Sequence, residues 1–167
     1  PSWTGSPSLT GNLLLPYAST PASGTIRKGA FPFLHAFGLS NTFVGLESGN
    51  FTMTGEQNTG AGFATLLDNT TGTGNVALGS NALQFNTTGY YNTASGGTAL
   101  YVNTTGFQNT AAGALALANN STGSQNTAGG TSAMQNNTTG SVNTAYGVGA
   151  LYNNTSGASN IALGHNA

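Results

Sequence analysis

The sequence predicts an all-β fold: a parallel β-solenoid, or β-roll, of about eight 17-residue rungs with a short N-terminal β cap or arm. Three observations predict this fold. From His35 onward, the 167-residue chain repeats every 17 residues without insertion or deletion. Each repeat carries two or three glycines, which oppose helix and mark turns. Seventeen residues are also too few for a helix pair, because helical repeats run to about 33 residues or more.

The first 34 residues do not follow the repeat, and we expect them to form an N-terminal cap or an assembly arm. Two apolar, strand-like pieces lie at 12–17 and 25–34, joined by a linker rich in Ser, Thr, Pro, Ala and Gly. A solenoid needs a cap because an open end exposes unpaired strand-edge groups. Both interpretations, cap and arm, remain open.

Residues 35–167 are the repeat itself, with the consensus N-T-T-G-x-x-N-T-A-x-G-x-x-A-L-x-x. We call each copy a rung and number its positions from 1, beginning at His35. Positions 4, 7 and 11 never vary. Position 4 is the turn glycine: Gly38, Gly55, Gly72, Gly89, Gly106, Gly123, Gly140 and Gly157. Position 7 is asparagine: Asn41, Asn58, Asn75, Asn92, Asn109, Asn126, Asn143 and Asn160. Position 11 is glycine again: Gly45, Gly62, Gly79, Gly96, Gly113, Gly130, Gly147 and Gly164.

Two short strands are predicted in each rung, one over the N-T-A-x segment and one over the x-A-L-x segment. Stacked rungs lie about 4.8 Å apart, so that equivalent residues form columns along a rod. Alternation along the first strand turns positions 7, 9 and 11 inward and positions 8 and 10 outward. The small Asn, Ala and Gly side chains at the inward positions predict a thin, tightly packed interior.

Two columns are expected to join the rungs. The amide of a position-7 asparagine can donate to one neighbouring rung and accept from the other, which makes an Asn ladder. Aspartate would not serve there, because carboxylates stacked at this spacing repel one another. Position 15 is expected to form the main apolar ladder of the core: Leu66, Leu83, Leu100, Leu117, Met134 and Leu151.

Charge is almost absent from the chain. Charged residues make up 3% of it, and residues 69–167 contain none. Without a basic patch, nucleic-acid binding is not expected, and no apolar run reaches the roughly 18 residues that insertion into a membrane needs. Three carboxylates, two histidines and no cysteine leave little material for a metal or catalytic site, and His35 and His165 lie at opposite ends of the repeat. We therefore expect no enzymatic activity and no cofactor.

The N-T-T-G segments also have the form of N-glycosylation sequons. Their position-1 acceptors are Asn69, Asn86, Asn103, Asn120, Asn137 and Asn154. One acceptor in each rung could line an edge of the rod with glycans. Alternatively, the four residues simply form a turn, in which Asn hydrogen-bonds nearby backbone and Gly adopts a positive φ. Both interpretations remain open.

Other side chains leave further alternatives. The threonines that recur at position 8 suggest ice binding as a further, less favoured function. Against it, no T-x-T array recurs from rung to rung. Aromatic residues at variable positions are expected to pack or to form a chain–chain interface, with a sugar-binding strip as the alternative. These aromatic residues are Tyr90, Tyr91, Tyr101, Phe107, Tyr146 and Tyr152.

The rung resembles repeats of bacterial surface proteins and phage tail fibres. The segments GNVALGSNA at 74–82 and SNIALGHNA at 159–167 look like the head repeats of trimeric autotransporter adhesins (YadA-like). The resemblance covers residues 35–167 and implies left-handed parallel β-rolls, commonly three chains side by side, that project from a cell or virion and bind surfaces. Adhesin heads repeat at about 14 residues, so neither the trimer geometry nor any receptor-binding residue is carried over.

These observations favour a non-enzymatic extracellular or cell-surface protein: a β-solenoid subunit of a fibre or filament. Its expected partner is itself, as a trimer or as a head-to-tail filament joined by β contacts. The last rung is incomplete and leaves a strand edge near Ala167 at which another copy could pair. The alternative is an adhesin head, or a tail-fibre module of a phage virion, that binds cell-surface glycans or receptors.

Overall fold

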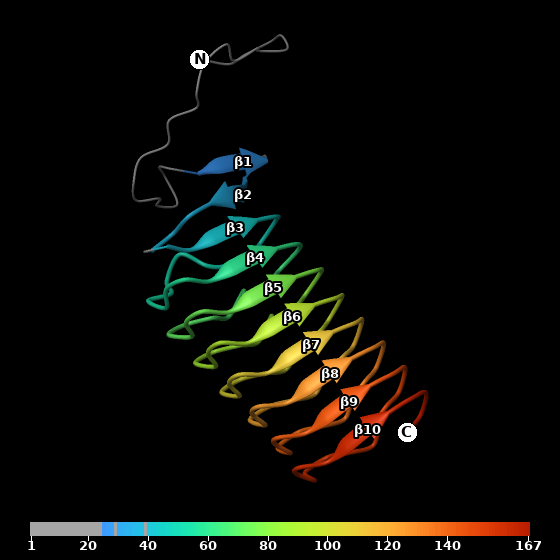
Figure 1. The fold of residues 1–167 in the computed structure, drawn as a ribbon. Coiled ribbons are helices and arrows are strands. Elements are labelled where there is room, and N and C mark those ends of the chain that lie inside the picture. The colour runs from blue at the N-terminus through green and yellow to red at the C-terminus, as the bar shows by residue number, and fades with distance from the viewer. Residues whose placement is uncertain (1–24, 29, 39) are drawn as a thin grey trace, which may run out of the picture.

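The computed structural model describes residues 25–28, 30–38 and 40–167, which form a rod of stacked coils (Figure 1). The strand-like piece expected at 12–17 lies outside these residues. Within them, every regular element is a β-strand, and all ten strands belong to one sheet in chain order. The strands are β1 (Ile26–Lys28), β2 (Phe31–His35), β3 (Thr42–Val44), β4 (Thr59–Ala61), β5 (Val76–Leu78), β6 (Thr93–Ser95), β7 (Thr110–Ala112), β8 (Thr127–Gly129), β9 (Thr144–Tyr146) and β10 (Ile161–Leu163).

The predicted β-solenoid is confirmed. Strands β3 to β10 pair in parallel, and each pairing joins residues one repeat apart, such as Thr93 with Thr110. The coils keep the same outline and stack in register along the rod (Figure 1). Seven repeat spacings separate β3 from β10, so the solenoid has about seven full turns.

At its N-terminal end the sheet changes direction. Strands β1 and β2 form an antiparallel pair, and β2 also runs antiparallel to β3, with Leu34 opposite Val44 and His35 opposite Phe43. The sequence predicts one strand-like piece over 25–34, whereas the structure divides that segment into two strands. Because β2 pairs with β3, the first parallel strand does not present an open edge on that side.

Each rung contains one strand rather than the two that the sequence predicts. The x-A-L-x segment is not extended, because positions 13 and 15 adopt left-handed backbone conformations, as at Leu115 (φ 62°) and Leu117 (φ 52°). The segment still stacks from rung to rung: the Leu100 N–H donates to Ala116 O at 3.0 Å. The side of the coil opposite the sheet is therefore a column of identical turns.

The core lies inside the coils, where the predicted alternation is confirmed for positions 7 to 10. Position 11, which the sequence also predicts to face inward, is half-buried, and at Gly164 it is exposed. Position 9 is buried in every strand from β3 to β10, and positions 8 and 10 are exposed or half-buried. The position-15 ladder is fully buried at Leu66, Leu83, Leu100, Leu117 and Met134, and Leu151 packs against it half-buried.

The first rung fills the same space differently. Phe43 at position 9 is buried, and position 15 of that rung is Gly49. A Cβ on Gly49 would lie 2.7 Å from the Phe43 ring. The large side chain has therefore moved to the other wall of the coil, and the total core volume is kept, which close-packed interiors require.

Candidate functional site

The position-7 asparagines form a continuous ladder through the interior, which confirms the prediction. Asn92 shows the pattern: its backbone N–H and its Nδ2 donate to Asn75 Oδ1 in the preceding rung, at 3.0 and 3.1 Å. Its Nδ2 also donates to Gly106 O in the following rung, at 2.8 Å. The same three bonds recur in every rung from Asn75 to Asn143, and these side chains are 0% exposed. Burial costs little here because each amide hydrogen has an acceptor.

A second asparagine ladder, which the sequence does not lead us to expect, runs through position 1. Asn103 Nδ2 donates to Asn86 Oδ1 in the preceding rung at 2.7 Å. It also donates to Gly106 O in its own turn at 3.0 Å. The N-T-T-G segment is therefore a turn that Asn closes by bonding nearby backbone, which is the second of the two interpretations above.

The structure places the candidate glycosylation sites inside the molecule. Five of the six asparagines are 0% exposed, and the sixth, at the last coil, is half-buried. In all but the first of them, Nδ2 donates two hydrogen bonds, so the free amide that a glycan needs is absent. The five fully buried side chains also lack the space for a glycan. Glycosylation of the folded rod is therefore incompatible with burial at Asn69, Asn86, Asn103, Asn120 and Asn137, and with the bonds of Asn154. The signal for a ladder was present in the sequence, because Asn recurs at one fixed position in six successive rungs.

The turn glycines are required by contact rather than by a positive φ. Of the eight, only Gly38 has a positive φ, 78°. A Cβ on Gly89 would collide with Asn86 Oδ1 and with Gly106 O of the next rung. The expectation of a left-handed glycine in this turn is therefore wrong, and the side chain is excluded because two asparagine columns converge there.

Left-handed glycines occur instead at position 11. Gly113 has φ 141°, and a Cβ there would lie 2.5 Å from the carbonyl of Gly130. Backbones of successive rungs approach closely at this corner, directly after each strand. Position 11 is thus invariant for both reasons that favour glycine, its φ and its lack of a side chain.

Hydroxyl groups at position 2 add a third polar column. Thr87 Oγ1 donates to Thr104 O at 2.9 Å, and Thr104 Oγ1 donates to Ser121 O at 2.9 Å. Either Ser or Thr can make this bond, which explains why both occur at position 2. The hydroxyls are therefore used to join rungs.

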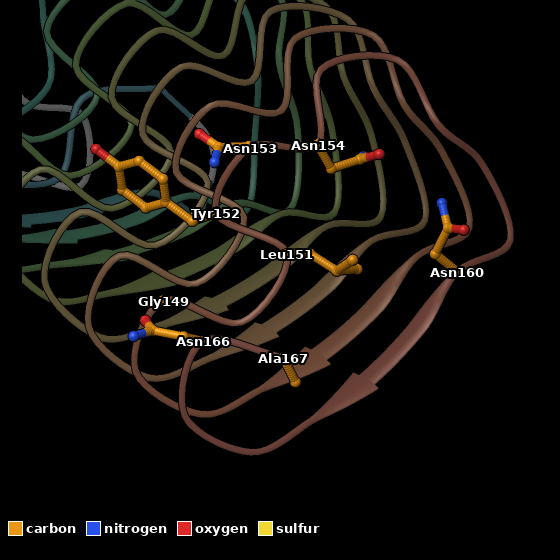
Figure 2. Close-up of a pocket in the computed structure, with 8 residues that line it drawn as sticks. All are labelled: Gly149, Leu151, Tyr152, Asn153, Asn154, Asn160, Asn166 and Ala167. Carbon is orange, nitrogen blue, oxygen red and sulfur yellow. The ribbon is translucent and has the colours of Figure 1, made fainter.

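At the C-terminal end of the described solenoid, the side chains of the last coil are not covered by a further rung, so the ladder residues line an open hollow. In Figure 2, Leu151, Asn154 and Asn160 point toward the inside of this coil, and Tyr152 points away from it. The hollow that they line has a volume of about 450 Å³. Each of these three inward residues continues a column that is buried in earlier rungs, so the hollow is the cross-section of the solenoid core.

The buried titratable group of the described chain is His35, at the junction of β2 with the first coil. Its ring is 3% exposed and lies 5.0 Å from the Phe43 ring and 4.6 Å from the Phe51 ring, measured between centroids. Nε2 donates to Ser48 O at 2.8 Å, and Nδ1 has no partner. Burial lowers the pKa of His35, and the bond to Ser48 offsets part of that effect.

The described part of the chain holds no group of three His, Cys, Asp or Glu residues that could bind a metal ion. Across residues 25–28, 30–38 and 40–167, no helix is long and apolar enough to span a membrane. His35 and His165 lie at opposite ends of the rod, in β2 and in the last coil.

The predicted aromatic residues divide between packing and exposure. Tyr101 packs edge-on against Phe85, with ring centroids 4.8 Å apart, and is half-buried. Tyr146 and Tyr152 are 51% and 40% exposed. The remaining three gather in one surface cluster: Tyr90, Tyr91 and Phe107.

No family model, no curated protein and no solved structure matches the chain. Its function is therefore inferred from the geometry and chemistry of its own residues.

Proposed function

We propose that the chain is a non-enzymatic structural protein, the β-solenoid subunit of an extracellular fibre or filament whose copies join through β contacts. The observation that carries this proposal is the pair of asparagine ladders. From the third rung onward they bind each rung to the next with a repeating set of hydrogen bonds, which are buried in all but the last coil. Such a molecule is suited to being long, stiff and uniform, as a fibre requires.

The use of the hydroxyl groups supports a structural role. A serine or threonine becomes a nucleophile when a neighbouring base takes its proton. In the rungs, the hydroxyl of Thr87 donates instead to the backbone carbonyl of Thr104. The one buried histidine, His35, uses Nε2 for the Ser48 carbonyl.

Strand β10 offers a geometry for assembly. The Thr144 N–H of β9 donates forward to Asn160 O at 2.8 Å. The equivalent donor of β10 is the Ile161 N–H, which points the same way and meets no residue that the structure describes. A strand edge of this kind is a template for pairing, with a further rung or with another chain.

An extracellular or cell-surface setting follows from the resemblance of residues 35–167 to surface adhesins and tail fibres, and a phage virion is the alternative. The second candidate function is an adhesin head or tail-fibre module that binds surface glycans or receptors. The exposed rings of Tyr90 and Tyr91 favour it. The two functions predict different assemblies: a fibre subunit forms filaments, whereas an adhesin head remains a discrete particle.

Negative-stain electron microscopy of the purified chain across a concentration series tests the fibre. We expect regular filaments that lengthen with concentration. Ile161→Pro removes the forward donor but spares the bonds of Asn160 and Gly164 to β9, and should abolish filaments. Ile161→Thr, which restores the commonest residue of position 8, is the matched control and should form filaments. Discrete particles at every concentration, or filaments of Ile161→Pro, would contradict assembly through this edge.

A further inference from the structure

An exposed aromatic platform lies beside the two asparagine ladders, at positions 5 and 6 of adjacent rungs. It consists of Tyr90, Tyr91 and Phe107. The rings of Tyr90 and Phe107 are stacked, with centroids 4.9 Å apart and an interplanar angle of 2°. Tyr91 meets Tyr90 edge-on at 5.6 Å and is 58% exposed, and Tyr90 is 39% exposed. The core already buries its own apolar column, so these rings are not needed to fill it.

The platform is held in place by the rungs on either side. The Tyr91 ring occupies the space above Gly74, where a Cβ would lie 2.5 Å from the ring. The Tyr91 N–H donates to Thr73 O at 2.9 Å, and Tyr90 O accepts from the Gln108 N–H at 3.0 Å. A ligand would therefore meet rings that are already ordered, which lowers the entropy cost of binding.

Amide groups continue the platform along position 6. Gln108 and Gln125 are both exposed, and Gln125 Nε2 lies 3.5 Å from Gln108 Oε1, to which it donates. Gln108 Nε2 and Gln125 Oε1 have no hydrogen-bond partner among the described residues. Position 6 of three successive rungs thus offers the apolar ring face of Tyr91, the free Nε2 donor of Gln108 and the free Oε1 acceptor of Gln125.

We propose that the platform and these two amides bind a neutral oligosaccharide that lies along the rod. A pyranose ring has an apolar C–H face that packs on an aromatic ring, and hydroxyls that bond to amides. Tyr91 would carry one sugar ring, and Gln108 and Gln125 would bind hydroxyls of the next. A charged glycan does not fit, because residues 69–167 contain no charged side chain to pair with it.

The alternative occupant, a second copy of the chain, needs more surface than the platform has. A stable protein–protein contact buries about 800 Å² on each partner. A single aromatic side chain buries about 150–250 Å² when it is fully covered. The three rings of the platform are already partly buried, so they supply only a small part of that area.

This inference deepens the second candidate function, and its failure would leave the structural role intact. The test is an NMR titration with cello-, malto-, manno- and chitohexaose, up to about 10 mM each, following Tyr91 and Gln108. We expect saturable shift changes at both residues with at least one of these sugars. Tyr91→Gly should weaken that binding at least tenfold. It should also fold, because Tyr91 has φ 54° and glycine holds the equivalent position at Gly74.

Tyr146→Ser is the matched control, since it removes another exposed tyrosine from a position that is Ser95 in an earlier rung. Its sugar affinity should equal that of the unsubstituted chain. No shift change with any of the four hexasaccharides would overturn the proposal, as would binding that survives Tyr91→Gly. Binding of polygalacturonate alone would show a charged ligand instead. Self-association that Tyr91→Gly abolishes would assign the platform to a second copy.

Discussion

The side chains of Asn75 and Asn86 donate to the same acceptor, Gly89 O, at 2.9 and 3.0 Å. Asn75 belongs to the position-7 ladder and Asn86 to the position-1 ladder, so this carbonyl joins the two columns. The arrangement recurs at Gly72, Gly106, Gly123, Gly140 and Gly157. A rung that slipped by one residue would unpair both buried amides at once, so the ladders fix the register of the stack.

Replacing one ladder amide by a carboxylate should break this pattern. In Asn92→Asp, the side chain can no longer donate to Gly106 O or to Asn75 Oδ1, and a charge is placed where exposure is 0%. We expect the free energy of unfolding to fall by about 3–5 kcal/mol at neutral pH, the usual cost of an uncompensated buried charge. Urea unfolding followed by circular dichroism measures it. Part of the lost stability should return in acid, because protonation of the introduced aspartate removes its charge and restores one hydrogen-bond donor.

Asn119→Asp provides the matched control. Asn119 Nδ2 also donates to an asparagine of the next rung, at Asn136 Oδ1, but the Asn119 side chain is exposed. We expect a change within about 0.5 kcal/mol, as for most surface substitutions. Equal losses in the two variants would show that burial of the ladder is not what stabilises the rungs.

A methyl group on a turn glycine should also destabilise the rod, although by less than a charge on a ladder. The Cβ of Gly89→Ala would meet Asn86 Oδ1 and Gly106 O, neither of which can move without breaking ladder bonds. We expect a loss of about 1–3 kcal/mol, typical of overpacking. Gly97→Ala is the control, because nothing lies within 4 Å of its Cβ and its φ is not positive. It should be neutral or stabilise by up to about 1 kcal/mol. Thermal melts of the two variants that coincide would contradict the contact argument.

The sequence predicts the period, the parallel stacking and the inward column of asparagine, because these depend on which residues recur at which spacing. The recurrence of Asn at position 1 is also a signal for a ladder, but the letters N-T-T are the same whether Asn103 faces solvent, as a glycosylated residue would, or the core. The choice is made by Gly106 O and Asn86 Oδ1, which only the folded stack brings together.

The missing second strand has a different cause. Leu115 and Leu117 have side chains that favour extended or helical backbone, yet both adopt left-handed conformations. Such conformations cost about 1–2 kcal/mol for a residue other than glycine. Here they are imposed by bonds between rungs, such as the Leu115 N–H to Gly97 O at 3.0 Å. A preference overridden by partners one repeat away cannot be read from the local sequence.

This strain predicts a stabilising substitution. Val142 is a β-branched residue with φ 60°, and its side chain is 53% exposed. Gly74 occupies the equivalent position with φ 68°. We expect Val142→Gly to raise the free energy of unfolding by up to about 1 kcal/mol, because the relief of left-handed strain exceeds the entropy that glycine adds to the unfolded chain. Val148→Gly, at a site that is 50% exposed without a positive φ, should instead destabilise. A lower melting temperature for Val142→Gly than for Val148→Gly would contradict this explanation.

Acid should loosen the junction between the N-terminal strands and the first coil. Burial holds the pKa of His35 below its ordinary value of 6.5. As pH falls below 6.5, the unfolded chain takes up a proton that the folded chain does not, so stability is complete above 6.5 and is lost as pH falls toward the lowered folded pKa. A proton on Nδ1 would also be buried without a partner, between two aromatic rings.

Amide hydrogen exchange measures this effect where it is expected. The Gly45 N–H donates to Phe33 O at 2.7 Å and joins β2 to the start of the solenoid, whereas the Gly113 N–H donates to Ser95 O at 2.8 Å within the shaft. Between about pH 7.5 and pH 5, protection of Gly45 relative to Gly113 should fall. His35→Gln does not titrate in this range and should remove the pH dependence, and His165→Gln, in the exposed last coil, should retain it. If the ratio for His35→Gln still fell with pH, another group would have to control the junction.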